Sequence, residues 1–167
     1  GFHRYATDRA WSVPHFEKML YDSAQLLGLY ARSYAFTKDP LYRYVAEEVA
    51  TYLEHEMWLS DGGFASAQDA EVNEVEGASY VWTAEEIETV LGPERAREFL
   101  AFYQLVPMEE TQKSVLRIAR RGSPQNLSER DSVQAEVNRQ REQRWCVERL
   151  ESFREDRKKL LAARRAR

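Results

Sequence analysis

The sequence has 167 residues, of which 43% are hydrophobic and 12% aromatic, and its formal net charge is −4. This is the size of one domain with enough apolar material for a core, which argues against disorder throughout. No unbroken apolar run reaches about 18 residues, and the first residues lack a signal-peptide pattern, so we expect neither a membrane span nor an export signal.

The cysteine count bears on the cellular compartment of the protein, and the charge distribution bears on its partners. Cys146 is the one cysteine, so it has no partner for an internal disulfide, a zinc cluster or a redox pair, and we expect a cytoplasmic protein. Residues 1–127 carry 12 Lys and Arg against 20 Asp and Glu, whereas residues 128–167 carry 12 against 8. The basic end has few aromatics and matches no nucleic-acid module, so we expect a solvated helix end and no nucleic-acid partner.

The first predicted helix runs from about Phe16 to Phe36. Its start follows Pro14, because proline is favourable in the first turn of a helix and disfavours helix in the residues before it. Its apolar residues cover most of its circumference, which is typical of a helix enclosed on more than one side. The remaining polar residues form a thin seam: His15, Lys18, Asp22, Gln25 and Arg32.

Asp39 and Pro40 predict the start of a second helix, because Asp39 can accept from free N–H groups and Pro40 lacks one. This helix should end near Trp58, and its clean division into apolar and charged faces is typical of a helix with one side in water. We therefore expect an inner helix followed by an outer helix.

Two short extended segments are predicted at residues 64–66 and 79–82, forming a small β-hairpin around the acidic loop QDAEVNEVEG. Thr83 and Glu86 then form a capping box for a helix that ends near Leu91, and Pro93 opens another.

The last third of the chain combines a brief strand with a long helix. The strand is expected at residues 115–118, before a turn at residues 122–124. A charged helix should follow from about Ser132 to Ala163, and because it lacks a strict heptad, a coiled coil is the weaker interpretation.

Five stretches of the sequence together resemble a known family. They are GFHRYATD, WSVPHFEKMLYDSAQLL, DPLYRYVAEEVATYL, DGGFASAQDAE and YVWTAEEIETVLG. In this order they are similar to the YyaL-like family, also called spermatogenesis-associated protein 20-like, in which a thioredoxin-like domain precedes a barrel similar to N-acylglucosamine 2-epimerases. The resemblance implies a mainly α fold, a partial (α/α)6 toroid of the six-hairpin glycosidase type with a small β-hairpin insertion.

The same resemblance implies that residues 1–167 are a fragment of one barrel domain. Residues 1–126 would hold the helical hairpin, the β-hairpin and short helices, and residues 127–167 the long charged helix. The family's thioredoxin-like domain has no counterpart here, and we expect the uncovered apolar surface of an incomplete ring to favour self-association.

In such a barrel the ligand pocket lies at one end, near the starts of the inner helices. The catalytic candidates that this implies are His15, Glu17 and Asp22, and the substrate-binding candidates are His3, Arg4, Tyr5, Trp11, Asp69 and Trp82. Histidine and carboxylates can move a proton beside a sugar carbonyl, and aromatic rings offer flat faces to a sugar.

Ordinary structural interpretations stand beside these roles. His15 could hydrogen-bond at a helix start, and Glu17 could complement the macrodipole. Lys18 and Asp22 have the spacing of a surface ion pair. Asp69 could solvate a turn or contribute to a cation site, but no motif for a metal, a nucleotide or another cofactor is present.

Two functions remain open from the sequence. The first is a carbohydrate-active protein, similar to sugar epimerases, isomerases or glycosidases, with a carbohydrate ligand. The alternative is a non-catalytic helical scaffold that works with the family's thioredoxin-like domain. The sequence leaves undecided whether the protein is an enzyme, because this resemblance is one of fold.

Overall fold

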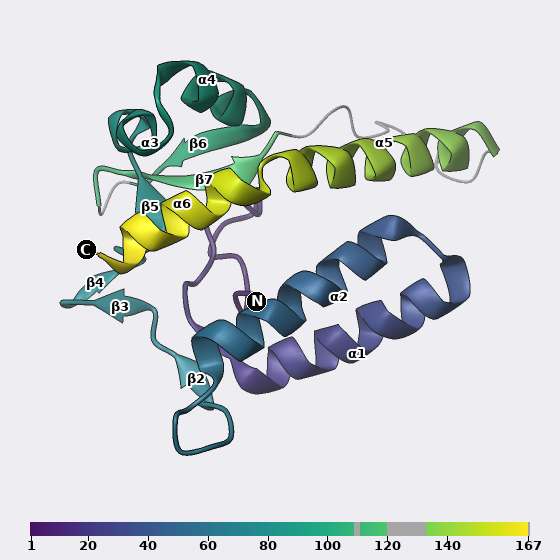
Figure 1. The fold of residues 1–167 in the computed structure, drawn as a ribbon, viewed down its shortest axis with the longest axis horizontal. Helices are drawn as coiled ribbons and strands as arrows, with labels where there is room; N and C mark the ends of the chain where they lie inside the picture. Colours follow the sequence, from purple (N-terminus) through teal and green to yellow (C-terminus); the bar gives the residue numbers. More distant parts are fainter. Residues whose placement is uncertain (109–110, 120–132, 167) are drawn as a thin grey trace.

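The computed structural model describes residues 1–108, 111–119 and 133–166. The hairpin of α1 (Leu20–Thr37) and α2 (Pro40–Tyr52) forms one side of the molecule, and a small sheet with α3 (Ala84–Leu91) and α4 (Pro93–Phe102) forms the other (Figure 1). Between them run α5 (Val133–Ser152), which packs against α2, and α6 (Arg154–Arg165), which packs against α3. The fold is mainly helical with small sheets, as expected, and the toroid stays a prediction.

The first helix begins later than predicted. Helix α1 spans Leu20–Thr37, and the residues before it are extended, with Lys18–Met19 (β1) pairing antiparallel to Ala67–Gln68 (β2). The segment from His15 to Lys18 therefore lies outside the helix. The prediction of a helix from Phe16 was wrong because pairing with β2 competes successfully for the backbone at this point.

The second helix follows its prediction. Helix α2 spans Pro40–Tyr52 and continues as a π-helical turn over Leu53–Met57, so the helical segment ends one residue before Trp58. The Asp39 side chain accepts from the Leu41 N–H at 2.9 Å, as the capping pattern predicted.

The predicted β-hairpin is wrong in its pairing. Val81–Trp82 (β5) pairs with Ser114–Ile118 (β7), which also pairs with Tyr103–Pro107 (β6). The acidic loop instead forms its own hairpin from Glu71–Val72 (β3) and Val75–Glu76 (β4). Sequence periodicity indicated extended segments but carried no information about which partner each would find.

Both short helices begin where the sequence predicts, and the first ends at the predicted residue Leu91. Helix α3 spans Ala84–Leu91 and α4 spans Pro93–Phe102. The capping box is complete, because Glu86 N–H donates to Thr83 Oγ1 at 3.2 Å and Thr83 N–H donates to a Glu86 carboxylate oxygen at 2.9 Å.

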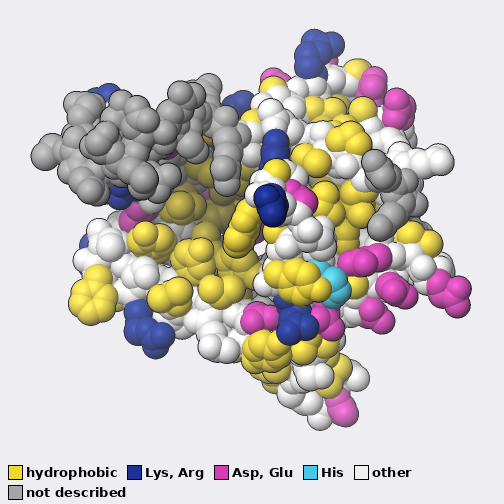
Figure 2. Space-filling model, turned by 180° about the vertical axis from the view of Figure 1, so that it is seen from behind, with side chains coloured by type: hydrophobic (Ala, Val, Ile, Leu, Met, Phe, Trp, Pro, Cys, Tyr) yellow, Lys and Arg dark blue, Asp and Glu magenta, His cyan; other side chains and the backbone are white. Residues whose placement is uncertain are grey.

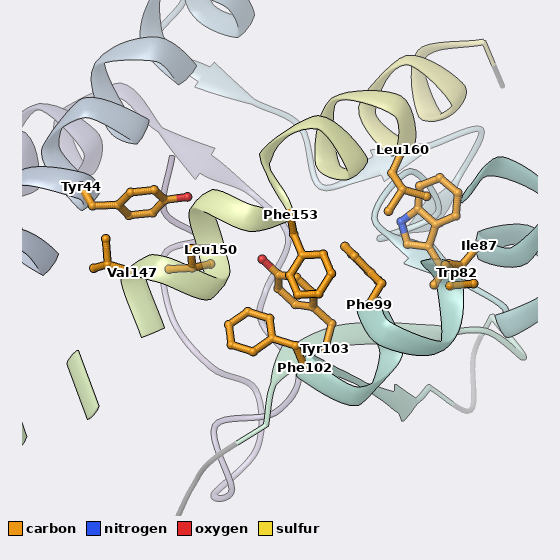
Figure 3. Close-up of a cluster of buried hydrophobic side chains, with 11 residues drawn as sticks. Tyr44, Trp82, Ile87, Phe99, Phe102, Tyr103, Val147, Leu150, Phe153 and Leu160 are labelled. Atoms are coloured by element: carbon orange, nitrogen blue, oxygen red, sulfur yellow. The ribbon is translucent and has the colours of Figure 1, made fainter. Parts of the chain in front are cut away.

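The long charged helix is interrupted at Phe153. Helix α5 spans Val133–Ser152 and α6 spans Arg154–Arg165, which corrects the prediction of one helix. The Phe153 side chain is fully buried, with its ring 5.4 Å from that of Phe99 and 5.7 Å from that of Phe102 (Figure 3). The break lets this ring enter the main core. The predicted turn at residues 122–124 lies outside the described residues.

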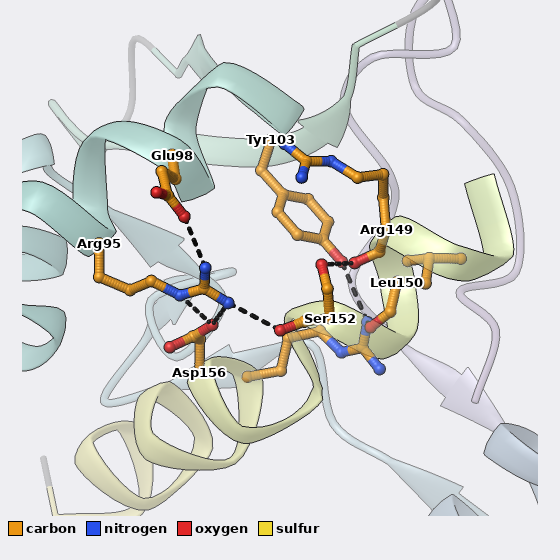
Figure 4. Close-up of polar contacts among 8 residues, drawn as sticks. Arg95, Glu98, Tyr103, Arg149, Leu150, Ser152 and Asp156 are labelled. Carbon is orange, nitrogen blue, oxygen red and sulfur yellow. Dashed lines mark hydrogen bonds and ion pairs between the residues drawn. The ribbon is translucent and has the colours of Figure 1, made fainter. Parts of the chain in front are cut away.

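A buried carboxylate ties α6 to α4. Arg95 donates through Nε to Asp156 at 2.9 Å, and its other nitrogens reach Glu98 and the Ser152 carbonyl at 2.6 and 2.7 Å (Figure 4). Asp156 is buried, so this charge-assisted pairing offsets the cost of removing the carboxylate from water.

Helix α1 leaves apolar side chains uncovered. Tyr21, Leu29 and Phe36 are exposed, Phe36 by 88%, although the sequence predicted an enclosed helix. Hydrophobic side chains gather over the α1–α2 half of the face in Figure 2, while acidic ones gather over the half with β3 and β4. Within the described ranges, no helix has the length and apolar character to cross a membrane.

We predict that Phe153→Ala lowers the free energy of unfolding by about 3–5 kcal/mol, because it leaves a cavity among aromatic rings. Urea denaturation followed by circular dichroism measures this change. Val137→Ala, on the exposed face of α5, is the matched control and should change stability by less than about 1 kcal/mol. Equal effects of the two substitutions would contradict this placement of the core.

Candidate functional site

The N-terminal segment lies antiparallel beside residues 13–17. Thr7 N–H donates to the Val13 carbonyl and His15 N–H to the Tyr5 carbonyl, both at 2.9 Å, with a bridge between Ala6 and Pro14. This pairing holds both segments extended and places side chains of one beside those of the other.

Asp8 fixes the turn that joins the two segments. Its carboxylate accepts from the N–H groups of Ala10, Ser12 and Val13 at 2.7, 3.0 and 2.6 Å. The bond from Val13, followed by those from Ser12 and Ala10, lowers the pKa of Asp8 and keeps it ionised.

Arg4 contacts two of the candidate carboxylates, those of Glu17 and Asp22. Its Nη1 donates to Glu17 at 2.9 Å, and its Nε lies 4.0 Å from an Asp22 oxygen. The hydrogen bond to Glu17 raises the pKa of Arg4 above its usual value. The Asp22 oxygen nearest Arg4 is buried and accepts no hydrogen bond from a described residue. The carboxylates of Glu17 and Asp22 are therefore held on one cation, although they come from different elements.

Tyr5 and His15 form the neighbouring contact along the same two segments. Their rings stack with centroids 4.8 Å apart, and Tyr5 is exposed. His15 Nε2 lies 3.9 Å from a Glu76 oxygen in β4, and its buried Nδ1 has no hydrogen-bond partner among the described residues. The interpretation of His15 as a helix-start residue is wrong because it precedes α1. Sequence reasoning missed Glu76, although the acidic loop that carries it was recognised.

His3 is held in its neutral form. Its Nδ1 lies 2.9 Å from the Phe16 carbonyl, which can only accept, so Nδ1 carries the proton and Nε2 keeps a free lone pair. The ring makes edge contacts with Phe16 and Tyr80. Burial, followed by the nearby charge of Lys18, lowers the pKa of His3 to about 4.

Phe16 is fully buried between these groups and the acidic loop. Its ring packs against Gly77, which has φ +71° and stands so close that a Cβ there would overlap the ring. A glycine is therefore required at residue 77 by both conformation and space. Phe16 in turn sets the position of its neighbours His15 and Glu17.

Lys18 is buried, with only 8% of its surface exposed. Its Nζ lies 4.7 Å from the centre of the Tyr52 ring and 4.9 Å from that of Tyr80. The predicted surface pair of Lys18 with Asp22 is wrong, because Lys18 belongs to β1 and its ammonium faces the two rings. Burial, followed by the charge of Arg164, lowers the pKa of Lys18 to about 8.

The two tyrosine hydroxyls around Lys18 share one acceptor. Tyr52 and Tyr80 donate to Gln68 Oε1 at 3.1 and 3.0 Å. Burial raises the pKa of both hydroxyls, so they remain protonated donors. Sequence reasoning assigned no role to Gln68, Tyr52 or Tyr80, because they meet only through tertiary contacts between β2, α2 and the segment before β5.

Three predicted substrate-binding residues lie apart from this strip. Trp11 is 76% exposed in the turn held by Asp8, and Asp69 accepts from the Glu71 N–H at 3.1 Å within its own loop. Trp82 is buried in the main core and lines a cavity of about 260 Å³ beside α6. Of the nine candidates, five therefore lie on the paired segments and Asp22 lies beside them in the first turn of α1; the five are His3, Arg4, Tyr5, His15 and Glu17.

The same residues offer little to a metal ion. Within residues 1–108, 111–119 and 133–166, no three His, Cys, Asp or Glu side chains are grouped as metal ligands. Glu17 and Asp22 face Arg4, a cation that would repel another cation at this position.

We predict that the free energy of unfolding falls by about 1–3 kcal/mol as the pH decreases from 6.5 to 4, through His3 alone. The pKa of this side chain is about 4 in the fold and 6.5 when free, so the unfolded chain binds more protons in that window. His3→Asn keeps a donor for the Phe16 carbonyl but does not titrate, and should remove this part of the pH dependence in urea denaturation. His55→Asn, at an exposed position, should leave the wild-type dependence intact, and an unchanged profile in His3→Asn would refute the assignment.

Comparison with known proteins gives relatives for about half of the chain. Spermatogenesis-associated protein 20 of Mus musculus is 44% identical over 97 residues, covering 54% of this chain and 12% of that protein. The Homo sapiens protein of the same name is 45% identical with the same coverage, and an uncharacterised Caenorhabditis elegans protein is 39% identical over 104 residues, covering 57% of this chain and 14% of that protein. No family model matches the chain. The chain thus matches about an eighth of the length of these relatives, and over the matched residues it is similar to spermatogenesis-associated protein 20.

Proposed function

We propose that the chain contributes the ligand-binding strip of a carbohydrate-active protein. The observation that carries the proposal is the grouping of Arg4, Tyr5, His15 and Glu17 on two paired segments, with Asp22 of the first turn of α1 beside them. This group combines an exposed aromatic ring with a guanidinium, two carboxylates and an imidazole, which are groups that can bind a ligand rich in hydroxyl groups.

The chemistry of the strip suits a sugar. Tyr5 presents an exposed ring that can lie against the apolar face of a pyranose, while Arg4 and the carboxylates can bind its hydroxyl groups. His15, with Glu76 nearby, has the side-chain type that moves protons near neutral pH. An epimerase-like or isomerase-like proton transfer beside a carbonyl is the reaction that these groups support best, ahead of glycoside hydrolysis.

The resemblance to (α/α)6 barrels adds support of a weaker kind, since one fold hosts many functions. In that architecture the residues that precede an inner helix lie at the mouth of the ring. Arg4 and Glu17 precede α1, which is the position that the proposal requires.

A non-catalytic scaffold is the second candidate, and one observation favours it. Tyr21, Leu29 and Phe36 of α1 are exposed, and apolar side chains at such positions are typical of surfaces that other protein segments cover. This scaffold would act with the thioredoxin-like domain of the family and would bind no sugar.

Ligand-observed NMR and thermal unfolding of this chain with a panel of monosaccharides and disaccharides test the proposal. We expect at least one sugar at ten times its Kd to add about 1.4 kcal/mol to the free energy of unfolding. His15→Ala and Glu17→Gln should each abolish this stabilisation, whereas His55→Ala should retain it. Absence of binding by every sugar, or equal binding by all three variants, would overturn the proposal in favour of the scaffold.

A further inference from the structure

We infer that Lys18 is a carbonyl-reactive amine, at which a small aldehyde condenses to form an imine. The inference is independent of the sugar proposal, since it concerns a different side chain and a covalent step. It starts from where the lysine lies, in β1 between the rings of Tyr52 and Tyr80.

The surroundings of Lys18 leave its positive charge poorly compensated. The tyrosine hydroxyls donate to Gln68 Oε1, and Nζ lies over the two ring faces without a hydrogen bond to either hydroxyl. Among the described residues, no carboxylate lies within ion-pair distance of Nζ. Contact with two ring faces compensates only part of the lost hydration, so the neutral amine is favoured more than at the protein surface.

Glu56 is the carboxylate that acts on Lys18 from a greater distance, and it is already paired. It lies 3.5 Å from Arg164 and also accepts from Arg165. Arg164 in turn lies over the Tyr80 ring, 5.0 Å from its centre. The acid and the arginine therefore largely neutralise each other beside the lysine, and α6 closes this side of the cluster.

Space for a small molecule adjoins the cluster. The cavity of about 260 Å³ beside α6 has Arg164 and Trp82 in its lining. Lys18 does not line this cavity, but Arg164 also covers the Tyr80 ring that Lys18 contacts, so this one side chain touches both the cavity and the lysine cluster. A volume of this size can hold an aldehyde of a few carbon atoms.

The chemical step is a condensation that balances without an oxidant or a reductant. The nitrogen lone pair of neutral Lys18 adds to the aldehyde carbon and forms a C–N bond, giving a carbinolamine. The C–O bond then breaks, and the oxygen leaves with the two amine hydrogens as water. The neutral amine is the reactive species, so a lysine whose ammonium form is disfavoured reacts faster near neutral pH.

Reductive trapping with glyceraldehyde and cyanoborohydride tests the inference on the folded chain at pH 7. Peptide-resolved mass spectrometry should show Lys18 labelled about tenfold or more faster than Lys38, because a pKa near 8 leaves far more neutral amine than the ordinary value of 10.5. Lys38 is the matched control, since it also lies over a tyrosine ring, at 5.6 Å from Tyr34, but is exposed. Labelling of Lys18 at or below the rate of Lys38 would overturn the inference.

Two further measurements keep the outcome specific to the fold. In about 8 M urea, where the chain is unfolded, the two lysines should react at similar rates, and a preference for Lys18 that persists there would count against a folded site. Between pH 7 and 10, labelling of Lys18 should level off above about pH 8, and a continued rise to pH 10 would count against the inference. The titratable and charged groups around Lys18 in this range are Tyr52, Glu56, Tyr80, Arg164, His3 and the amino group of Gly1.

Discussion

The docking of α6 is the interaction on which the arrangement of the chain depends. Phe153 places its ring among those of Phe99 and Phe102, while Arg95 reaches across to Asp156 from α4. On the opposite side, Arg157 donates to the hydroxyl of Tyr44 and lies 3.4 Å from Glu48, both in α2. One short helix thus binds the sheet layer and the helical hairpin together, with aromatic packing on one side and charge-assisted hydrogen bonds on the other.

The basic end of the chain therefore has an internal role. Arg157 and Arg164 pair with Glu48 and Glu56, so the positive charge of residues 128–167 meets part of the negative charge of the preceding segment. From composition alone, the basic charge of residues 128–167 was expected to lie in solvent at a helix end. For these arginines it is instead paired with carboxylates of the same molecule. Exposed pairs such as Lys158 with Glu155 contribute little beside them.

Local sequence patterns predicted most helices of the fold, whereas contacts between distant residues determine the strand pairing and the composition of the site. The starts of α2 and α3 could be predicted from Asp39 with Pro40 and from Thr83 with Glu86, because a helix cap uses residues a few positions apart. The start of α1 was not, because β1 pairs with β2 across a large separation in sequence. The same limit applies to the site: His15 and Glu17 could be named from the sequence, but Glu76 and the tyrosines around Lys18 come from elsewhere in the chain.

Gly77 connects the acidic loop to the candidate strip through the single ring of Phe16. Because neither the conformation of this glycine nor the space beside it admits a side chain, any replacement would press on Phe16 and shift the two residues beside it. A genetic screen for loss of function would then group Gly77 with the histidine and the glutamate that it never touches. The positions most sensitive to substitution should therefore be those joined through the packing of Phe16, even where they are far apart in the sequence.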